Sequence, residues 1–259
     1  SPILTIFFEN LNQKSDYLNF FSSSEFRSYT KNSVIILTSV LFLTLFLGGI
    51  SAYLVSFYEF IGVNFFKYSL LLSFAIPPYI YAYTLSAFFE NFGIAHSIIS
   101  FFSEDLSKKF NPKIEPLIGS IISLSLTLFG YVFILARSTF LNQSRDLIEV
   151  GKSLGFNNVD TIVKIIIPSA RPAIFIGLSL VAMETLSDFG TVSFFGISTF
   201  TTGIYNSWFI FDDLKTANFL SLFLILFILF FFGLESISRK NIKFFNSNNS
   251  FNKKNKKVI

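Results

Sequence analysis

The chain has 259 residues, of which 52% are hydrophobic and only 14% charged, and its formal net charge is +4. Soluble domains carry about 25% charged residues, so this composition, with its 38 phenylalanines, excludes a soluble globular protein. It also excludes disordered and collagen-like chains, and the lack of cysteine excludes disulfides, iron–sulfur clusters and thiolate metal sites. The sequence therefore predicts an all-α protein that crosses a membrane as a bundle of helices.

Five apolar segments are long enough to cross a bilayer, which takes about 20 helical residues. In chain order we expect spans over residues 34–57, 65–89, 117–136, 172–192 and 217–234. The second span contains Pro77 and Pro78, which remove backbone donors and so predict a kinked or broken helix. Such a break can shape a solute pathway beside it or be a kink without functional consequence, and the sequence leaves both readings open.

Lysine and arginine are unevenly distributed between the segments that join these spans. If the C-terminus is cytoplasmic, the inner segments 58–67, 137–171 and 235–259 hold 13 of them and the outer segments hold 7. Positive residues concentrate on the cytoplasmic side, so we expect residues 1–33 outside and the basic tail 238–259 inside. Residues 1–20 lack the pattern of a signal peptide, so an earlier span is expected to precede this chain.

The long inner loop 137–171 contains two short amphipathic stretches. Ser144 is expected to cap the first as a helix, and Gly155 to end it in the left-handed conformation. The second stretch is expected over residues 159–167, stopping before Pro168. Two short helices joined by a glycine turn can present a rigid knob to a partner, or they can be an ordinary connector on the membrane surface.

The same loop resembles the "EAA" loop of ABC-transporter permeases. Four positions match that pattern in spacing: Glu149, Gly155, Ile165 and Pro168. The sequence departs from the pattern where Val150 and Gly151 replace two alanines and Ile167 replaces a leucine. Because glycine lowers helix stability by about 1 kcal/mol relative to alanine, position 151 predicts a looser loop.

Two further segments resemble bacterial ferric-iron ABC permeases in particular. Residues 73–79 are similar to their "AIPPY" segment, and residues 183–192 are similar to "METLxDFGTV", followed by matching residues up to 209. The resemblance covers about residues 30–237 and is to the first half of permeases in which two homologous halves are fused. The sequence departs from it at residues 129–131, where that family often has proline before the tyrosine. The tail 238–259 is either a linker to a second half or a terminus.

The resemblance implies the MetI-like bundle of type I importers and a transport subunit in the bacterial inner membrane that is not an enzyme and binds no cofactor. The sequence contains no GxxxxGK[ST] motif, so ATP is expected to bind elsewhere. The implied partners are a second permease half, two ATP-binding subunits, a periplasmic substrate-binding protein and membrane lipid, without nucleic acid. The implied cargo is ferric iron.

The loop residues are expected to transmit movement from the ATP-binding subunits. Glu149 and Gly155 are the first candidates, Asp146 and Lys152 are candidate surface contacts, and Pro168 closes the motif. Glu149 has an alternative role, in which it only pairs with a nearby lysine of the loop.

Glu184 and Asp188 are the only acidic residues within a predicted span. Four residues apart, they are expected to share one face of a helix. Ionisable groups at membrane depth are costly and usually face a cavity or the protein interior, and their oxygens suit a hard cation. These two acids, with Pro77 and Pro78, are therefore candidates for the translocation path, and a purely structural role for the acids remains open.

Three other functions compete with that of an iron permease. Thiamine, phosphonate, polyamine, sulfate and molybdate permeases share the EAA loop, so the cargo can differ within the class. In an ion-coupled carrier, Glu184 and Asp188 would bind the coupling ion. A membrane-embedded enzyme predicts clustered histidines, cysteines or acids, which a chain with one histidine and no cysteine does not offer.

Overall fold

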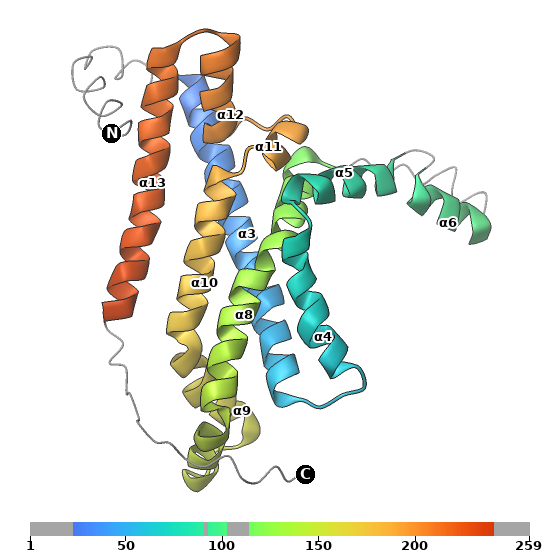
Figure 1. The fold of residues 1–259 in the computed structure, drawn as a ribbon, viewed down its shortest axis with the longest axis vertical. Helices are drawn as coiled ribbons and strands as arrows, with labels where there is room; N and C mark the ends of the chain where they lie inside the picture. Colours follow the sequence, from blue (N-terminus) through green and yellow to red (C-terminus); the bar gives the residue numbers. More distant parts are fainter. Residues whose placement is uncertain (1–22, 91–92, 103–113, 241–259) are drawn as a thin grey trace.

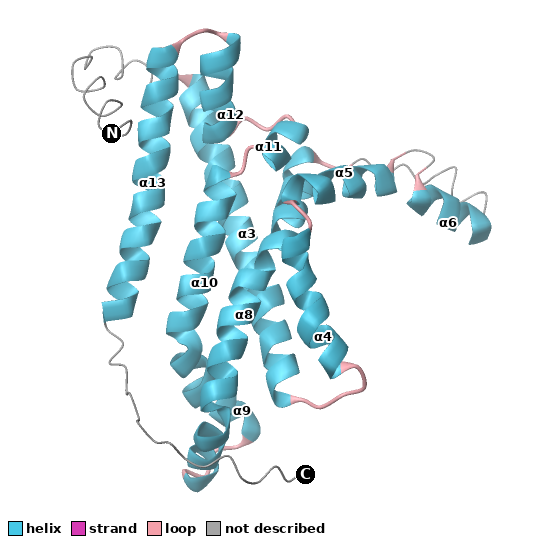
Figure 2. Ribbon diagram, viewed as in Figure 1, coloured by secondary structure: helices cyan, strands magenta, loops and turns pink. Residues whose placement is uncertain are grey.

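A computed structural model describes residues 23–90, 93–102 and 114–240, and within these ranges every regular element is a helix (Figure 2). Side chains at 142–148, 150, 152, 158–159 and 234–240 lie outside the description. The longer helices are α3 (Ser24–Phe57), α5 (Pro78–Phe89), α8 (Pro116–Ser153), α10 (Ile167–Ser187) and α13 (Leu214–Lys240). The shorter ones are α4 (Val63–Ser69), η1 (Leu70–Ala75), α6 (Ile94–Phe102), α9 (Asn158–Thr161), η2 (Ile162–Ile166), α11 (Gly190–Phe194), α12 (Phe200–Tyr205) and η3 (Asn206–Ile210).

Five stretches of the described chain are long and apolar enough to cross a membrane. They are Ser24–Phe57, Pro78–Phe102, Pro116–Leu141, Ile162–Ser187 and Leu214–Gly233. The predicted fold class, an all-α bundle with about five candidate membrane spans, is confirmed, although the bounds of the spans differ from those expected.

The second expected span, 65–89, is not one helix. The chain rises along the bundle through α4 and η1, and it then turns at Ile76 and Pro77, whose backbones are extended. Helix α5 starts at Pro78 and runs across the bundle rather than along it (Figure 1). A residue that precedes a proline disfavours the helical conformation. A proline is tolerated at the first position of a helix, because the backbone N–H that it lacks has no hydrogen-bond partner in the helix at that position. The two prolines therefore break the helix.

The loop and the fourth span also differ from expectation. Helix α8 runs without interruption from the third span to Ser153, so Ser144 lies inside a helix and does not cap one. The second stretch does not stop before Pro168, because α9, η2 and α10 follow one another without a break up to Ser187. The π-helical turn η2 directly precedes Pro168, and its wider backbone accommodates a proline ring that clashes in a regular α-helix.

The core forms where α8 passes between α3 and α10. Gly48 of α3 and Gly177 of α10 both lie against Val132 of α8: a Cβ at position 48 would be 2.7 Å from the Phe129 carbonyl oxygen, and one at position 177 would be 3.0 Å from the Val132 Cα. Small residues let membrane helices approach this closely. Val132 is fully buried as a result, and the three helices pack along one another (Figure 1).

Candidate functional site

The first candidate site is the turn between α8 and α9. Helix α8 ends at Ser153, and Gly155 adopts a φ of +75°, so the left-handed end predicted at this glycine is confirmed. The Phe156 N–H donates to the Gly151 carbonyl at 3.0 Å, which closes the turn. A Cβ at Gly155 would meet no atom within 4 Å, so glycine is required here by its backbone conformation and not by space.

Asn157 starts the helix on the other side of this turn. Its side-chain oxygen accepts a 2.7 Å hydrogen bond from the Asp160 N–H, and its carbonyl accepts the Thr161 hydroxyl at 2.9 Å. This is an N-cap that sequence reasoning missed, although an asparagine just before an amphipathic stretch is the usual signal. The turn is thus tied at both ends by local hydrogen bonds.

Gly151 is buried, and α9 packs directly on it. A Cβ at position 151 would lie 2.5 Å from Thr161 Oγ1 and 2.6 Å from Thr161 Cγ2. Helix propensity alone predicts that glycine here loosens the loop, but the structure shows that its missing side chain is what lets α9 lie against α8. We refer to this unit, residues 149–167, as the knob.

The other candidate residues of the loop are distributed over the knob. Glu149 and Gly155 are exposed, whereas Pro168 is half-buried in the first turn of α10. The side chains of Asp146 and Lys152 lie outside the described part. Lys164 pairs with Asp160 at 2.8 Å and lies 5.1 Å above the Phe156 ring, and none of the described side chains pairs with Glu149.

The second candidate site contains Asp188, which lies one residue beyond the helix that carries Glu184. Helix α10 ends at Ser187, and Asp188 has an extended backbone with φ −65° and ψ 128°. Its carboxylate accepts hydrogen bonds from the N–H groups of Thr191 and Val192, at 3.0 and 3.2 Å, and from the Thr191 hydroxyl. Asp188 is therefore the C-cap of α10 and not part of the helix, and the shared face expected for the two acids stays a prediction.

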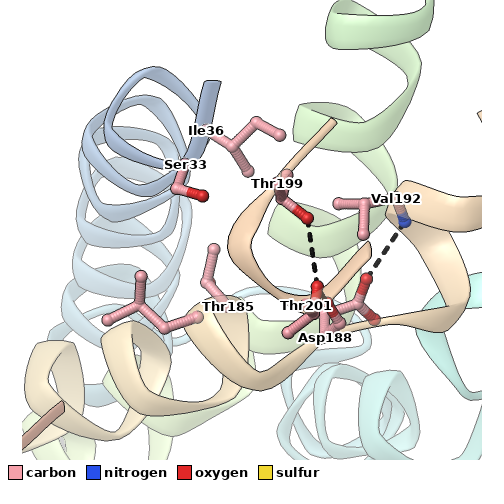
Figure 3. Close-up of a pocket in the computed structure, with 8 residues that line it drawn as sticks. Ser33, Ile36, Thr185, Asp188, Val192, Thr199 and Thr201 are labelled. Atoms are coloured by element: carbon pink, nitrogen blue, oxygen red, sulfur yellow. Dashed lines mark hydrogen bonds between the residues drawn. The ribbon is translucent and has the colours of Figure 1, made fainter. Parts of the chain in front are cut away.

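A small cavity lies beside Asp188, where α3, α10 and α12 meet (Figure 3). The centre of a water molecule can move within about 10 Å³ of this cavity, which is room for about one water. The Thr201 hydroxyl donates to the Asp188 carbonyl at 2.7 Å and lies 3.0 Å from the Thr199 hydroxyl. Burial raises the pKa of the Asp188 carboxyl, and the hydrogen bonds from Val192 and Thr191 only partly oppose this. Asp188 thus links the end of α10 to the start of α11 through its carboxylate and to α12 through its carbonyl, which is a structural role.

Glu184 lies in a different environment, on the exposed side of α10. Its Oε1 is 3.5 Å from the Tyr131 hydroxyl of α8, and the Tyr131 ring packs edge-on against Phe74 of η1 with centroids 4.7 Å apart. Tyr131 is a site residue that sequence reasoning noted only as part of a departure from the family pattern. Its signal was the single tyrosine of the predicted span 117–136.

The proline break lies next to this group. Phe74 stands three residues before Pro77, and Tyr79, just after Pro78, packs against Gly190 of α11. The structure therefore brings Glu184 and the proline break to one side of the bundle through Phe74 and Tyr131. Among the described residues no three histidines, cysteines or acids are close enough to hold a metal ion.

Sequence comparisons agree with this architecture. The family model described as "Binding-protein-dependent transport system inner membrane component" matches residues 44–243. The chain is 28% identical over 190 residues to "Fe(3+)-transport system permease protein FbpB 2" of Haemophilus influenzae, covering 73% of this chain and 33% of that protein. It is 25% identical over 145 residues to "Probable sulfate transport system permease protein cysT" of Chlorella vulgaris, covering 56% and 52%. The chain thus spans between a third and about half of the length of these relatives.

Solved structures show the same fold. One is an "amino acid ABC transporter with histidines", with a TM-score of 0.59 and 14% identity over 84% of this chain and 94% of that one. Another is a "bacterial ABC transporter involved in the import of the acidic polysaccharide alginate", with a TM-score of 0.66 and 16% identity over 88% and 83%. At these identities the likeness concerns the fold alone.

Proposed function

Because the chain belongs to the family of binding-protein-dependent transport system inner membrane components, we propose that it is the permease subunit of an ABC importer whose cargo is ferric iron. Membership makes it a multi-pass protein of the inner membrane and a non-catalytic transport subunit. Its partners in this proposal are a second permease half, ATP-binding subunits that supply the hydrolysis, and a periplasmic substrate-binding protein.

The observation that carries the choice of cargo is the environment of Glu184. This carboxylate is exposed on a helix that is apolar enough to span a membrane, and among the described residues it has no basic partner. The arginines and lysines of α8 and α10 lie towards the knob. An exposed carboxylate attracts a cation and repels an oxyanion, whereas recognition of sulfate favours basic side chains and backbone N–H groups. The longer match to the iron permease supports the same choice.

The knob is the proposed contact for an ATP-binding subunit. It is compact, it joins α8 to α10, and it exposes Glu149 together with apolar Leu154 and Val163. Because α8 continues from the core into the knob as one helix, a push on the knob moves the helix that carries Tyr131. The excess of basic residues near the knob and in the tail supports a cytoplasmic position for both.

The experiment that tests this function is uptake of radiolabelled ferric iron by cells that carry the complete transporter. Wild type is compared with a Glu149→Ala, Gly155→Ala double variant at equal expression. We expect iron uptake by wild type, and loss of uptake in the variant together with loss of the co-purified ATP-binding subunit. Normal uptake with the subunit still bound contradicts the role of the knob.

Sulfate is the second candidate cargo, because the match to a sulfate permease covers more than half of this chain. Wild-type cells that accumulate labelled sulfate but no iron would favour it and overturn the iron proposal.

A further inference from the structure

We propose that the Tyr131 hydroxyl and the Glu184 carboxylate form a two-oxygen site that binds ferric iron in transit. The inference rests on the proposed iron cargo and names the atoms that would touch it. Its starting point is one contact between two helices, since Tyr131 Oη on α8 and Glu184 Oε1 on α10 are 3.5 Å apart. The two residues are 53 positions apart in the sequence, so only the fold brings them together.

The pair does not have the character of a buried structural contact, because Glu184 is exposed on the described chain and Tyr131 only half-buried. A charged side chain within a membrane span is costly and is rarely left facing lipid. The single hydrogen bond to Tyr131 does not neutralise that charge. We therefore expect Glu184 to face water or the second permease half rather than lipid, on the side of the bundle where Phe74 and Tyr131 pack.

Both oxygens have the chemistry that ferric iron prefers. Carboxylates suit hard cations, and a tyrosine phenolate is a known protein ligand of ferric haem iron. When iron binds, the phenol releases its proton to water and the Tyr131 oxygen and a Glu184 oxygen each donate an electron pair to the ion. When iron leaves, the phenol takes a proton back from water, so the site returns to its starting protonation state.

Two ligands from one chain make a weak site, which suits transit because the ion must leave again. The remaining coordination positions would be filled by water or by the second permease half. Phe74 holds the Tyr131 ring from the side of η1, at 4.7 Å between centroids, and η1 ends at the proline break. A movement of η1 away from α8 would therefore remove this support from one side of the Tyr131 ring.

The test uses the complete transporter, purified through a tag on this chain and loaded with ferric nitrilotriacetate. Ferric phenolates absorb visible light by charge transfer from ligand to metal, so the site has a signature other than transport. Tyr131→Phe removes only the hydroxyl and keeps the ring against Phe74. The matched control is Tyr83→Phe, which removes an exposed hydroxyl from α5, where the ring contacts Phe194 instead.

We expect the visible band in wild type and Tyr83→Phe and its loss in Tyr131→Phe. Iron uptake by Tyr131→Phe and by Glu184→Gln should fall about tenfold or more, with the co-purified ATP-binding subunit retained. Iron uptake by wild type without the band, or a band and uptake that persist in Tyr131→Phe, overturns the transit site and leaves the proposed function standing. Absence of iron uptake by wild type overturns both.

Discussion

Gly151 and Thr161 lie in direct contact where the end of α8 meets α9. A Cβ on Gly151 would lie 2.5 Å from Thr161 Oγ1, 2.6 Å from its Cγ2 and 3.0 Å from its Cβ. Real Cβ atoms do not approach other atoms this closely, so any side chain at 151 must push α9 away. The glycine that departs from the resembled "EAA" pattern is thus matched by a threonine ten residues later.

Gly151→Ala is therefore expected to weaken the knob, although alanine is the better helix former. Helix propensity favours alanine by about 1 kcal/mol, but overpacking of a buried contact typically costs about 1–3 kcal/mol. We expect less ATP-binding subunit to co-purify with the variant and slower transport. Thr161→Ala in the same chain removes the two closest atoms and should restore both.

A glycine without such a neighbour provides the control for this pair. A Cβ added at Gly233 in α13 would meet no atom within 4 Å, so Gly233→Ala gains helix propensity alone and should leave co-purification unchanged. Co-purification at the wild-type level in Gly151→Ala, or a double variant no better than the single one, would contradict the role of this contact.

Gly48 and Gly49 give a second matched pair, in the membrane part of α3. A Cβ at position 48 would lie 2.7 Å from the Phe129 carbonyl oxygen and 2.8 Å from the Val132 Cβ, whereas one at position 49 meets nothing within 4 Å. We expect Gly48→Ala to lower the free energy of unfolding by about 1–3 kcal/mol and Gly49→Ala to raise it by up to about 1 kcal/mol. Thermal unfolding of the two variants in detergent measures the difference, and equal melting temperatures would show that α3 and α8 are not in close contact.

Local signals predicted much of this fold. The proline pair predicted the break between η1 and α5, and Gly155 predicted the left-handed end of its turn. Both effects depend on the backbone of one or two residues, so they are visible in the sequence. Apolar run lengths likewise predicted the number of spans.

The features that sequence reasoning missed depend on contacts between distant residues. Asp188 leaves the helix although no proline or glycine precedes it in that turn, and the Thr201 hydroxyl, 13 residues later, binds its carbonyl. The contact between Tyr131 and Glu184 joins two helices. Pro168 lies in a continuous helix because a π-helical turn comes first. None of these can be read from spacing along one segment.

The buried carboxyl of Asp188 predicts a pH dependence of stability. Its pKa is raised in the folded protein, mainly by burial, so the folded state holds its proton more tightly than the unfolded state. This contribution to stability is fully present below the unfolded value of 3.8 and is lost as the pH rises through the raised pKa. Asp188→Asn keeps an oxygen that caps α11 but does not titrate, so we expect its melting temperature to fall less than that of wild type between acid and neutral pH.

Asp213 provides a control, because its pKa is shifted in the opposite direction. The Thr216 hydroxyl, 2.6 Å from its carboxylate, is the main cause of its lowered pKa. Its contribution is therefore present above 3.8 and is lost as the pH falls through the lowered pKa. Asp213→Asn should lose stability at neutral pH relative to wild type. A pH profile of Asp188→Asn that overlays that of wild type would show that Asp188 does not titrate differently in the folded state.

Alanine variants of Gly155 and Gly196 distinguish the effect of backbone strain from the effect of where the glycine lies in the molecule. Both have left-handed backbones, with φ of +75° and +67°, and neither would place a Cβ within 4 Å of another atom. Alanine at either site therefore carries a similar strain of about 1–2 kcal/mol, but Gly155 lies in the knob and Gly196 follows α11 near the other end of the bundle (Figure 1). We expect similar losses of thermal stability from Gly155→Ala and Gly196→Ala, with loss of the co-purified ATP-binding subunit only in Gly155→Ala. Equal retention of the subunit by both variants would mean that the shape of this turn does not matter for the contact, whereas equal loss would mean that general destabilisation explains it.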